Sequence, residues 1–243
     1  MATADTTPLP PAQPACTRAR ERRNETTARA MTIIVAVDGP AAAGKGTLAR
    51  RLAQAFDLAY LDTGGLYRAV AAKVLAAGGD VRDTGATRAA AESLTSADLE
   101  RLDLRAEGVG AAASEVSAQP AVREALLAFQ RDFARNPPAG KSGAVLDGRD
   151  IGTVVCPDAC AKLFVTASLA ERARRRHEEL RARGEGRIYA EVLRDMEARD
   201  ARDAARDVAP LTAAPDAVRL DTSDLDAEAA FWAARDVVRR RCS

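Results

Sequence analysis

The sequence is poor in the side chains that usually hold metal ions. It contains one histidine, His177, and four cysteines, Cys16, Cys156, Cys160 and Cys242. The cysteines lack the paired spacing of a zinc site, and a single histidine cannot complete one. We therefore expect Cys156 and Cys160 to be small buried apolar side chains. His177 lies in ERARRRHEEL, which predicts an exposed helical position and no catalytic role.

A strong net charge and long apolar runs are also missing. The 243 residues carry a formal net charge of +1, so no overall field favours nucleic acid or a membrane surface as a partner. No run approaches the ~18 consecutive apolar residues that cross a bilayer, and no secretory signal follows the N-terminus. These absences predict a cytoplasmic protein. Any anion must be bound by a local cluster of basic residues.

Residues 1–30 differ in composition from the rest of the chain. They are rich in proline, threonine and arginine and have no apolar periodicity, so they cannot bury enough surface to fold. We expect a disordered N-terminal extension here and one folded domain over residues 31–243. A transit peptide is the alternative, although the prolines and the missing amphipathic pattern disfavour it. Met31 is an alternative start of the chain.

From Met31 onward, short β-branched runs alternate with longer helical patterns. This alternation predicts an α/β fold with a doubly wound, five-stranded parallel sheet covered by helices on both faces. The expected strands are residues 32–38, 58–63, 143–148, 161–167 and 217–223. Helices are expected to begin near Gly44, Gly65, Pro120, Leu169, Arg187 and Leu225. The helix at Leu169 has a capping box, Ser168 with Glu171, and Gly184 ends it.

The interval of residues 78–118 interrupts this alternation. It contains GGD, a helical pattern around residues 87–93 and the Ala/Gly-rich stretch EGVGAAASEVSAQ. We expect an insertion between core strands that carries substrate contacts. A plain surface excursion is the alternative.

The stretch GPAAAGKGT has the G-x-x-x-x-G-K pattern of a phosphate-binding loop, or P-loop. It lies between an expected strand and an expected helix, so its backbone N–H groups can point at the phosphates of ATP. Lys45 would reach the β- and γ-phosphates, and Thr47 would lie near Mg²⁺ or the α-phosphate. The residues expected to bind ATP are Gly39, Pro40, Ala41, Ala42, Ala43, Gly44, Lys45, Gly46 and Thr47.

Two further segments end strands at the same edge of the predicted sheet. LDTGGLYR supplies Thr63, Tyr67 and Arg68, and VLDGRDIGT supplies Asp147, Arg149 and Asp150. Ligands of doubly wound sheets bind at the carboxyl ends of the strands. Asp147 is a candidate to orient water on Mg²⁺, which we expect the nucleotide phosphates to hold with no direct protein ligand. Each arginine alone is more often a surface ion pair, but the shared location favours a second anion site.

The segment RDMEARDARDAARDVAPL places Arg199, Arg202, Asp203 and Arg206 on one helix face. On periodicity alone, a solvated helix with ion pairs is the favoured interpretation. The alternative is a mobile lid, residues 172–206, whose arginines close over two nucleotides. Closure would exclude water, and the guanidinium groups would neutralise the transferring phosphoryl group.

In this order, GPAAAGKGT, LDTGGLYR, SEVSAQPAVRE, DGRDIGTVV and RDARDAARDVAPL resemble the motifs of the bacterial cytidylate kinases, which are P-loop nucleoside monophosphate kinases. The likeness covers nearly everything from Thr32 to the C-terminus. It implies ATP-dependent phosphorylation of CMP and dCMP to CDP and dCDP in pyrimidine nucleotide metabolism, with Mg²⁺ as cofactor. The chain has a shorter insert than the family pattern and adds residues 1–30.

The resemblance also assigns roles to residues. The expected catalytic residues are Lys45, Asp147 and Arg149. In the CMP site, the cytosine ring would be read by Ser114, Arg123 and Asp150. The acceptor phosphate or base side would be met by Arg68, Arg149 and Arg206, and the sugar by Arg199 and Asp203. Thr63 and Tyr67 complete the set.

Cytosine recognition by these side chains is chemically reasonable. A carboxylate opposite the N4 amino group and a guanidinium opposite N3 or O2 satisfy cytosine, whereas uracil reverses the pattern. A monomer that uses ATP and CMP or dCMP is the leading expectation. A UMP or AMP kinase and a non-catalytic ATP-binding protein remain alternatives at this point.

Overall fold

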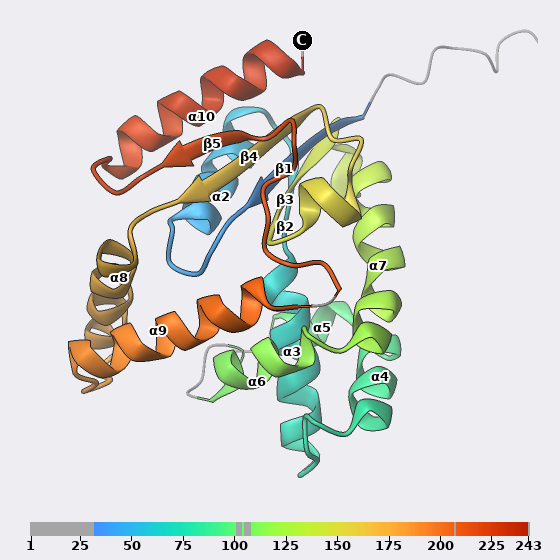
Figure 1. Cartoon of the computed structure of the whole chain (residues 1–243). Coiled ribbons are helices and arrows are strands. Elements are labelled where there is room, and N and C mark those ends of the chain that lie inside the picture. Colours follow the sequence, from blue (N-terminus) through green and yellow to red (C-terminus); the bar gives the residue numbers. More distant parts are fainter. Residues whose placement is uncertain (1–31, 101–103, 105–107, 207, 243) are drawn as a thin grey trace, which may run out of the picture. The chain divides into compact units, whose positions relative to one another are not determined.

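The strand Ile33–Asp38 (β1) lies in the middle of the sheet, and its side chains are apolar on both faces, which suits a strand covered on both sides. Figure 1 shows the computed structural model, which describes residues 32–100, 104, 108–206 and 208–242. The expected disordered extension, residues 1–30, lies outside the described residues.

All strand pairs of the sheet are parallel, in the order β2-β3-β1-β4-β5. β1 pairs with β3 (Gly143–Gly148) from Ile33 opposite Gly143 to Asp38 opposite Gly148. The other strands are β2 (Ala59–Asp62), β4 (Ala161–Thr166) and β5 (Val218–Asp221). The predicted doubly wound parallel sheet is confirmed, and the strand ends differ from the predicted ones by at most two residues.

Side chains alternate along β1 and build a core on each face of the sheet. Val35 and Val37 pack on the face covered by α2 (Lys45–Ala55) and α10 (Ala227–Arg241). Ile34 and Ala36 pack on the opposite face, against α3 (Thr63–Ala76) and α7 (Pro120–Arg135). Figure 1 shows these helices on both sides of the strands.

The remaining helices follow α3 and β4. The first group is α4 (Thr84–Glu92), α5 (Ser96–Leu99) and α6 (Val109–Val116), and the second is α8 (Leu169–Ala182) and α9 (Tyr189–Ala204). Two short helices flank β3: η2 (Pro138–Gly140) and the π-helix η3 (Ile151–Val155). The predicted helix at residues 87–93 is α4, which begins earlier because the Asp83 carboxylate accepts hydrogen bonds from two N–H groups of its first turn.

The predicted helix starts agree with the structure to within two residues, and those at Pro120 and Leu169 coincide with it. The capping box of α8 is only half right. Ser168 Oγ accepts a hydrogen bond from the Glu171 N–H at 3.3 Å, but the Glu171 carboxylate binds Arg174 and Arg175. Those arginines lie about one helical turn further along, and bonds between charged groups are stronger than a bond to a neutral N–H.

The prediction for Cys160 is wrong. Its sulfur is bonded to that of Cys242, whereas Cys156 is a buried free thiol as expected. His177 is helical, but it is half-buried with its ring edge against Tyr189. Among the described residues we find no helix with the length and apolarity needed to cross a membrane.

Candidate active site

The carboxyl ends of the parallel strands open into one cleft, which is lined by the segments that follow β1, β2 and β3 and by α6, α8 and α9. The cavity has a volume of about 490 Å³, a size typical of small-molecule sites. It brings together most of the predicted site residues: Ala41, Ala42, Lys45, Thr47, Thr63, Tyr67, Arg68, Arg123, Asp147, Arg149, Asp150, Arg199 and Arg206.

The P-loop is a tight turn between β1 and α2. Gly39 has a φ of +150°, and a Cβ there would lie 1.9 Å from the Val165 carbonyl oxygen, so only glycine fits. Gly44 has a φ of +85° and directly precedes the first helical residue, Lys45. The turn therefore presents the N-terminus of α2, where backbone N–H groups lack helical partners, to the cleft. Gly39 and Pro40, the first two residues of this turn, are buried.

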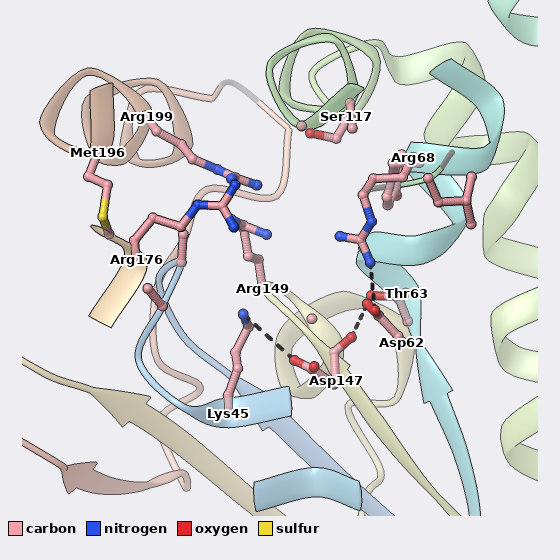
Figure 2. A pocket seen from close by; sticks show the side chains of 18 of the residues that line it. Lys45, Asp62, Thr63, Arg68, Ser117, Asp147, Arg149, Arg176, Met196 and Arg199 are labelled. Atoms are coloured by element: carbon pink, nitrogen blue, oxygen red, sulfur yellow. Dashed lines mark hydrogen bonds and ion pairs between the residues drawn. The ribbon is translucent and has the colours of Figure 1, made fainter. Parts of the chain in front are cut away.

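Glycine at position 46 has a steric reason. A Cβ there would lie 3.0 Å from Asp147 Oδ2, so the small residue lets the end of β3 approach α2. Asp147 Oδ1 lies 3.7 Å from Lys45 Nζ, an ion pair that is drawn as a dashed line in Figure 2. Burial raises the pKa of Asp147 and lowers that of Lys45, and in each case the opposite charge of the partner acts against the effect of burial. Asp147 Oδ1 is buried and accepts no hydrogen bond from the described residues.

The start of α3 forms the wall opposite Lys45. Asp62 caps this helix through the Gly65 N–H, and its other oxygen binds Arg68 Nη2 at 2.6 Å (Figure 2). Thr63 is buried and donates its hydroxyl hydrogen to the Asp147 carbonyl oxygen at 2.8 Å. This bond ties the β2 end of the cleft to the β3 end. The bond to Asp62 holds the Arg68 guanidinium in the cleft.

Asp150 and Arg123 form an ion pair in the deeper part of the cleft, beside the Tyr67 ring. Both side chains are about nine-tenths buried, and burial raises the pKa of Asp150. Ser114, the third predicted base-reading residue, is buried in α6, and its hydroxyl has no hydrogen-bond partner among the described residues. Within the described part of the chain the cleft is lined by Ser117 and not by Ser114.

Asp203 joins two arginines of the cleft. It is fully buried at the end of α9, and its carboxylate binds Arg149 on one side and Arg206 on the other. Arg206 also donates to Ser117 Oγ at 2.9 Å. The predicted common helix face is wrong in part, because α9 ends at Ala204 before Arg206 and because Arg202 is exposed. The spacing of residues at a period of 3.6 does not show where the helix ends.

A cluster of positive charge faces Lys45 across the cleft. Figure 2 shows the guanidinium groups of Arg149, Arg176 and Arg199 gathered above the Lys45 ammonium group. The pKa of Arg199 is lowered to about 9, mainly by burial and in part by the neighbouring charge of Arg149. Arg199 Nε has no hydrogen-bond partner among the described residues. Such a cluster favours a ligand with several negative charges.

Sequence reasoning missed several residues of this cleft, among them Asp62, Ser117 and Arg176. Asp62 and Ser117 are short polar residues without a charge pattern of their own, and their contacts depend on how α3 and α6 pack. Arg176 could have been found, because it is an arginine within the expected lid, residues 172–206, and lies on a predicted helix.

Known proteins with sequences similar to this chain are consistent with a nucleotide-binding cleft. The family model for cytidylate kinase matches residues 35–232. A protein of Paramagnetospirillum magneticum called cytidylate kinase is 58% identical over 86% of this chain and 98% of its own length. Proteins with the same name are 59% identical in Granulibacter bethesdensis, over 87% of this chain and 99% of that protein, and 60% identical in a Methylobacterium species, over 86% and 98%.

Proposed function

The chain belongs to the cytidylate kinase family, and from this premise we infer that its cleft transfers the terminal phosphoryl group of ATP to CMP or dCMP, giving CDP or dCDP. The observation that carries the inference is the position of Lys45 and the P-loop opposite Arg68, Arg149 and Arg199 in one cavity. Two molecules with several negative charges can meet there end to end because cations surround the meeting point.

The P-loop forms the donor side of the proposed reaction. The N-terminus of α2 offers N–H groups to the β-phosphate, and Lys45 reaches the β- and γ-phosphates. Lys45 is held beside Asp147, which directs its ammonium group into the cleft. We propose that the whole P-loop, residues 39–47, binds ATP.

Mg²⁺ fits the donor side. Asp147 Oδ1 is a buried oxygen without a hydrogen-bond donor among the described residues, which suits the acceptance of a hydrogen from metal-bound water. Thr47 lines the same cavity. No group of three or more His, Cys, Asp or Glu side chains among the described residues could hold a metal ion alone, so the nucleotide phosphates would supply the other ligands. When bound, the ion neutralises charge on the β- and γ-phosphates.

The acceptor side is proposed to lie between α3, α7 and the end of β3. Asp150 can accept hydrogen bonds from the cytosine N4 amino group, and Arg123 can donate to N3 or O2. The Tyr67 ring forms an apolar wall beside them. Ser114 does not line the cavity and would reach the base only after a movement of α6, whereas Asp203 acts on CMP through Arg149 and Arg206, which it binds.

Transfer itself needs charge stabilisation more than proton transfer. The second pKa of a phosphate monoester is about 6, so the acceptor phosphate is mostly dianionic at neutral pH and needs no general base. Arg149, Arg176 and Arg199 would neutralise the charge that spreads over the transferring group. Arg68 would hold the acceptor phosphate in line.

We further propose that residues 78–118 act as the acceptor-binding insert and that residues 172–206 act as a lid. The protein is also proposed to work as a monomer. It is proposed to work in the cytoplasm, because nucleotides with several charges do not cross a lipid bilayer unaided.

An acceptor panel tests the function. Purified protein is supplied with ATP, Mg²⁺ and one of CMP, dCMP, UMP or AMP, and ADP release is followed in a coupled assay. We expect CMP and dCMP to exceed UMP and AMP about 100-fold in kcat/KM, because the wrong base leaves buried polar groups unpaired. Chelation of Mg²⁺ should stop the reaction. Preference for UMP or AMP, or ATP binding without acceptor-dependent ADP release, would refute the proposal.

A further inference from the structure

Asp38 is the last residue of β1, and both oxygens of its buried carboxylate are engaged. Oδ1 accepts a hydrogen bond from the Ile151 N–H and Oδ2 accepts one from the Gly152 N–H, each at 2.8 Å. These two N–H groups begin the π-helix η3, which directly follows Arg149 and Asp150. A side chain of one strand therefore fixes the start of a helix that follows another strand.

Asp38 holds the acceptor loop, residues 149–152, at both ends. Its backbone lies opposite Gly148 in the β1–β3 ladder, just before the loop begins. Its carboxylate binds the main chain just after Asp150. The two residues between these anchors are Arg149 and Asp150, which both line the cleft. Their side-chain positions therefore depend on Asp38.

The residue after Asp38 is Gly39, where the P-loop begins. Asp38 is thus joined to the donor side through the chain and to the acceptor loop through hydrogen bonds. We propose that Asp38 is a positioning residue that sets the placement of the acceptor loop relative to the P-loop, and so aligns the acceptor phosphate with the ATP γ-phosphate. The proposal rests on the function inferred above. Alignment matters because small displacements of reacting groups cost large factors in rate.

The surroundings of Asp38 disfavour the charged form of its carboxylate. Its pKa is raised to about 7, mainly by burial and in part by the charges of Asp150 and Asp147, while its two backbone hydrogen bonds act in the opposite direction. Lys162 packs alongside Gly152, but its ammonium group binds Asp216 and a backbone carbonyl. A buried carboxylate without a paired cation is unfavourable, so its retention is explained by the two N–H groups that it orients.

The first test is Asp38→Asn in the full chain, with KM measured separately for CMP and ATP. The amide offers one accepting oxygen, and its NH₂ group faces an N–H group, so one anchor of the acceptor loop is lost. We expect KM for CMP to rise about tenfold, which lowers kcat/KM for CMP at least as much, and KM for ATP to stay within about twofold. If both KM values stay within about twofold, or if the two rise equally, the proposal is overturned.

Val35→Ala provides the matched control. Val35 lies in the same strand, is fully buried and belongs to the apolar core on the α2 and α10 face. Its truncation lowers the melting temperature through a cavity without touching the acceptor loop. We expect it to leave KM for CMP within about twofold of the unaltered protein. If KM for CMP rises as much in Val35→Ala as in Asp38→Asn, lost stability alone explains the change in KM, and the proposal is contradicted.

Gly152→Ala tests the same contact from the other side. A Cβ at Gly152 would lie 3.1 Å from Lys162 Cδ and 3.3 Å from Asp38 Oδ2, so it pushes the main chain away from an intact carboxylate. We expect a rise of about threefold in KM for CMP, with KM for ATP unchanged. This variant keeps the test decisive if Asp38→Asn does not fold. An unchanged KM for CMP would count against the proposal.

Hydrogen exchange reads the contact directly and needs no substrate. The Ile151 and Gly152 N–H groups should exchange about tenfold faster in Asp38→Asn, because a hydrogen-bonded amide exchanges only when its bond opens. Equal exchange in both proteins would overturn the proposal. If the unaltered protein fails to phosphorylate CMP, the proposed function is wrong, whereas the exchange result still decides whether Asp38 holds the loop.

The pH profile separates positioning from general destabilisation. Protonated Asp38 retains one accepting oxygen, so the acceptor loop is released as the pH falls below the pKa of about 7. Between about pH 8 and pH 6, KM for CMP should therefore rise more in the unaltered protein than in Asp38→Asn, where mainly the CMP phosphate, with its pKa of about 6, titrates. Parallel profiles would contradict the proposal.

Discussion

Three aspartates hold arginines of the cleft in fixed orientations. Asp62 binds Arg68, Asp150 binds Arg123, and Asp203 binds both Arg149 and Arg206. Charged groups stabilise a transition state best when they need not reorganise during the reaction. The planar guanidinium group also has a fixed direction once one of its edges is bound. These carboxylates therefore aim the free edges of the arginines and limit the repulsion between neighbouring positive charges.

At the residue scale, Lys45→Met should lower kcat about 1,000-fold. The lysine acts on ligand phosphates and contributes one partly screened contact, with Asp147, to the fold. Steady-state kinetics and thermal unfolding are measured together, and we expect the melting temperature to change by a few degrees at most, about 1 kcal/mol.

Lys162→Met is the matched control for Lys45→Met. Lys162 is also buried, but it binds Asp216 and the Pro157 carbonyl away from the cleft. This variant should lose stability and keep kcat within about twofold. Activity of Lys45→Met close to that of the unaltered protein would refute the P-loop assignment.

Asp150→Asn should impair the use of CMP and spare ATP. The substitution replaces a carboxylate by an amide of the same size, so Arg123 loses its ionic partner and one of the two accepting oxygens becomes an NH₂ donor that repels the cytosine amino group. We expect kcat/KM for CMP to fall about 10- to 100-fold, with KM for ATP nearly unchanged. Titration of ATP binding by fluorescence provides the comparison. Equal losses for both nucleotides would remove Asp150 from base recognition.

Residues that directly follow a strand could be predicted, whereas their partners could not. The P-loop, Asp147 and Arg149 were identified because parallel strands bring their carboxyl ends to one edge. The partnership of Arg149 with Asp203 spans 54 positions and depends on how α9 packs. Residue type and local spacing do not contain that information. The position of Ser114, one turn away from the cleft-lining Ser117, depends on the rotation of α6 in the same way.

At the scale of elements, α8 and α9 are joined to the P-loop by one buried arginine. Arg172 of α8 donates to the Ala167 carbonyl at 2.9 Å and to the Ala41 carbonyl of the P-loop at 3.4 Å, and it binds the Asp200 carboxylate of α9 at 2.6 Å. Asp200 directly follows Arg199, which lines the cleft. Arg172 therefore links the placement of Arg199 to the P-loop backbone.

Asp200→Asn should loosen this link. The amide keeps one hydrogen bond to Arg172 but removes the ionic attraction in a poorly solvated place, at a cost of about 1–2 kcal/mol. We expect kcat to fall about fivefold, since Arg199 is held less firmly. Turnover at saturating ATP and CMP and thermal unfolding measure the two effects.

Asp195→Asn is the matched control, because it alters an exposed aspartate of the same helix. Asp195 is 61% exposed and pairs with Arg187 at 2.8 Å. Surface pairs contribute little, so kcat and the melting temperature should stay nearly unchanged. Equal effects of the two substitutions would show that the buried link has no special importance.

Elements with a strong pattern were predicted well, and those without one were missed. The strands are short apolar runs with clear ends, and Pro120 and Ser168 mark two helix starts by their own chemistry. The sequence does not predict α6, because its three alanines and one glycine give little apolar contrast between faces. That helix is stabilised by packing on α3 through Val109, Ala112 and Ala113, which is a tertiary effect.

At the scale of the whole molecule, the last helix is fastened to the helix that carries the P-loop. Arg51 of α2 donates to the Ala227 carbonyl at 2.8 Å, binds Glu228 and lies over the Phe231 ring at 4.2 Å. The far end of α10 is joined through Cys242 to Cys160 beside β4. Both ends of α10 are thus fixed to the core.

Removing the disulfide should lower stability without reaching the cleft. The bond closes a loop of 82 residues, and the loss of such a closure costs about 3 kcal/mol, equivalent to a fall of about 6–12 °C in melting temperature. Thermal unfolding of the Cys160→Ser, Cys242→Ser double variant measures this cost. The variant should melt at the same temperature with and without reductant, whereas the unaltered protein should not. Identical melting of both proteins under oxidising conditions would contradict the prediction.

The same bond has a consequence for cleavage. It encloses residues 160–242 in a covalent ring that contains α8, α9 and the turn between them, where Gly184 and Gly186 are exposed. Exposed turns with small residues are preferred sites of proteolytic nicking. A protease that cuts this turn would open the ring and release nothing. The two pieces would migrate as one band on a denaturing gel until a reducing agent separates them.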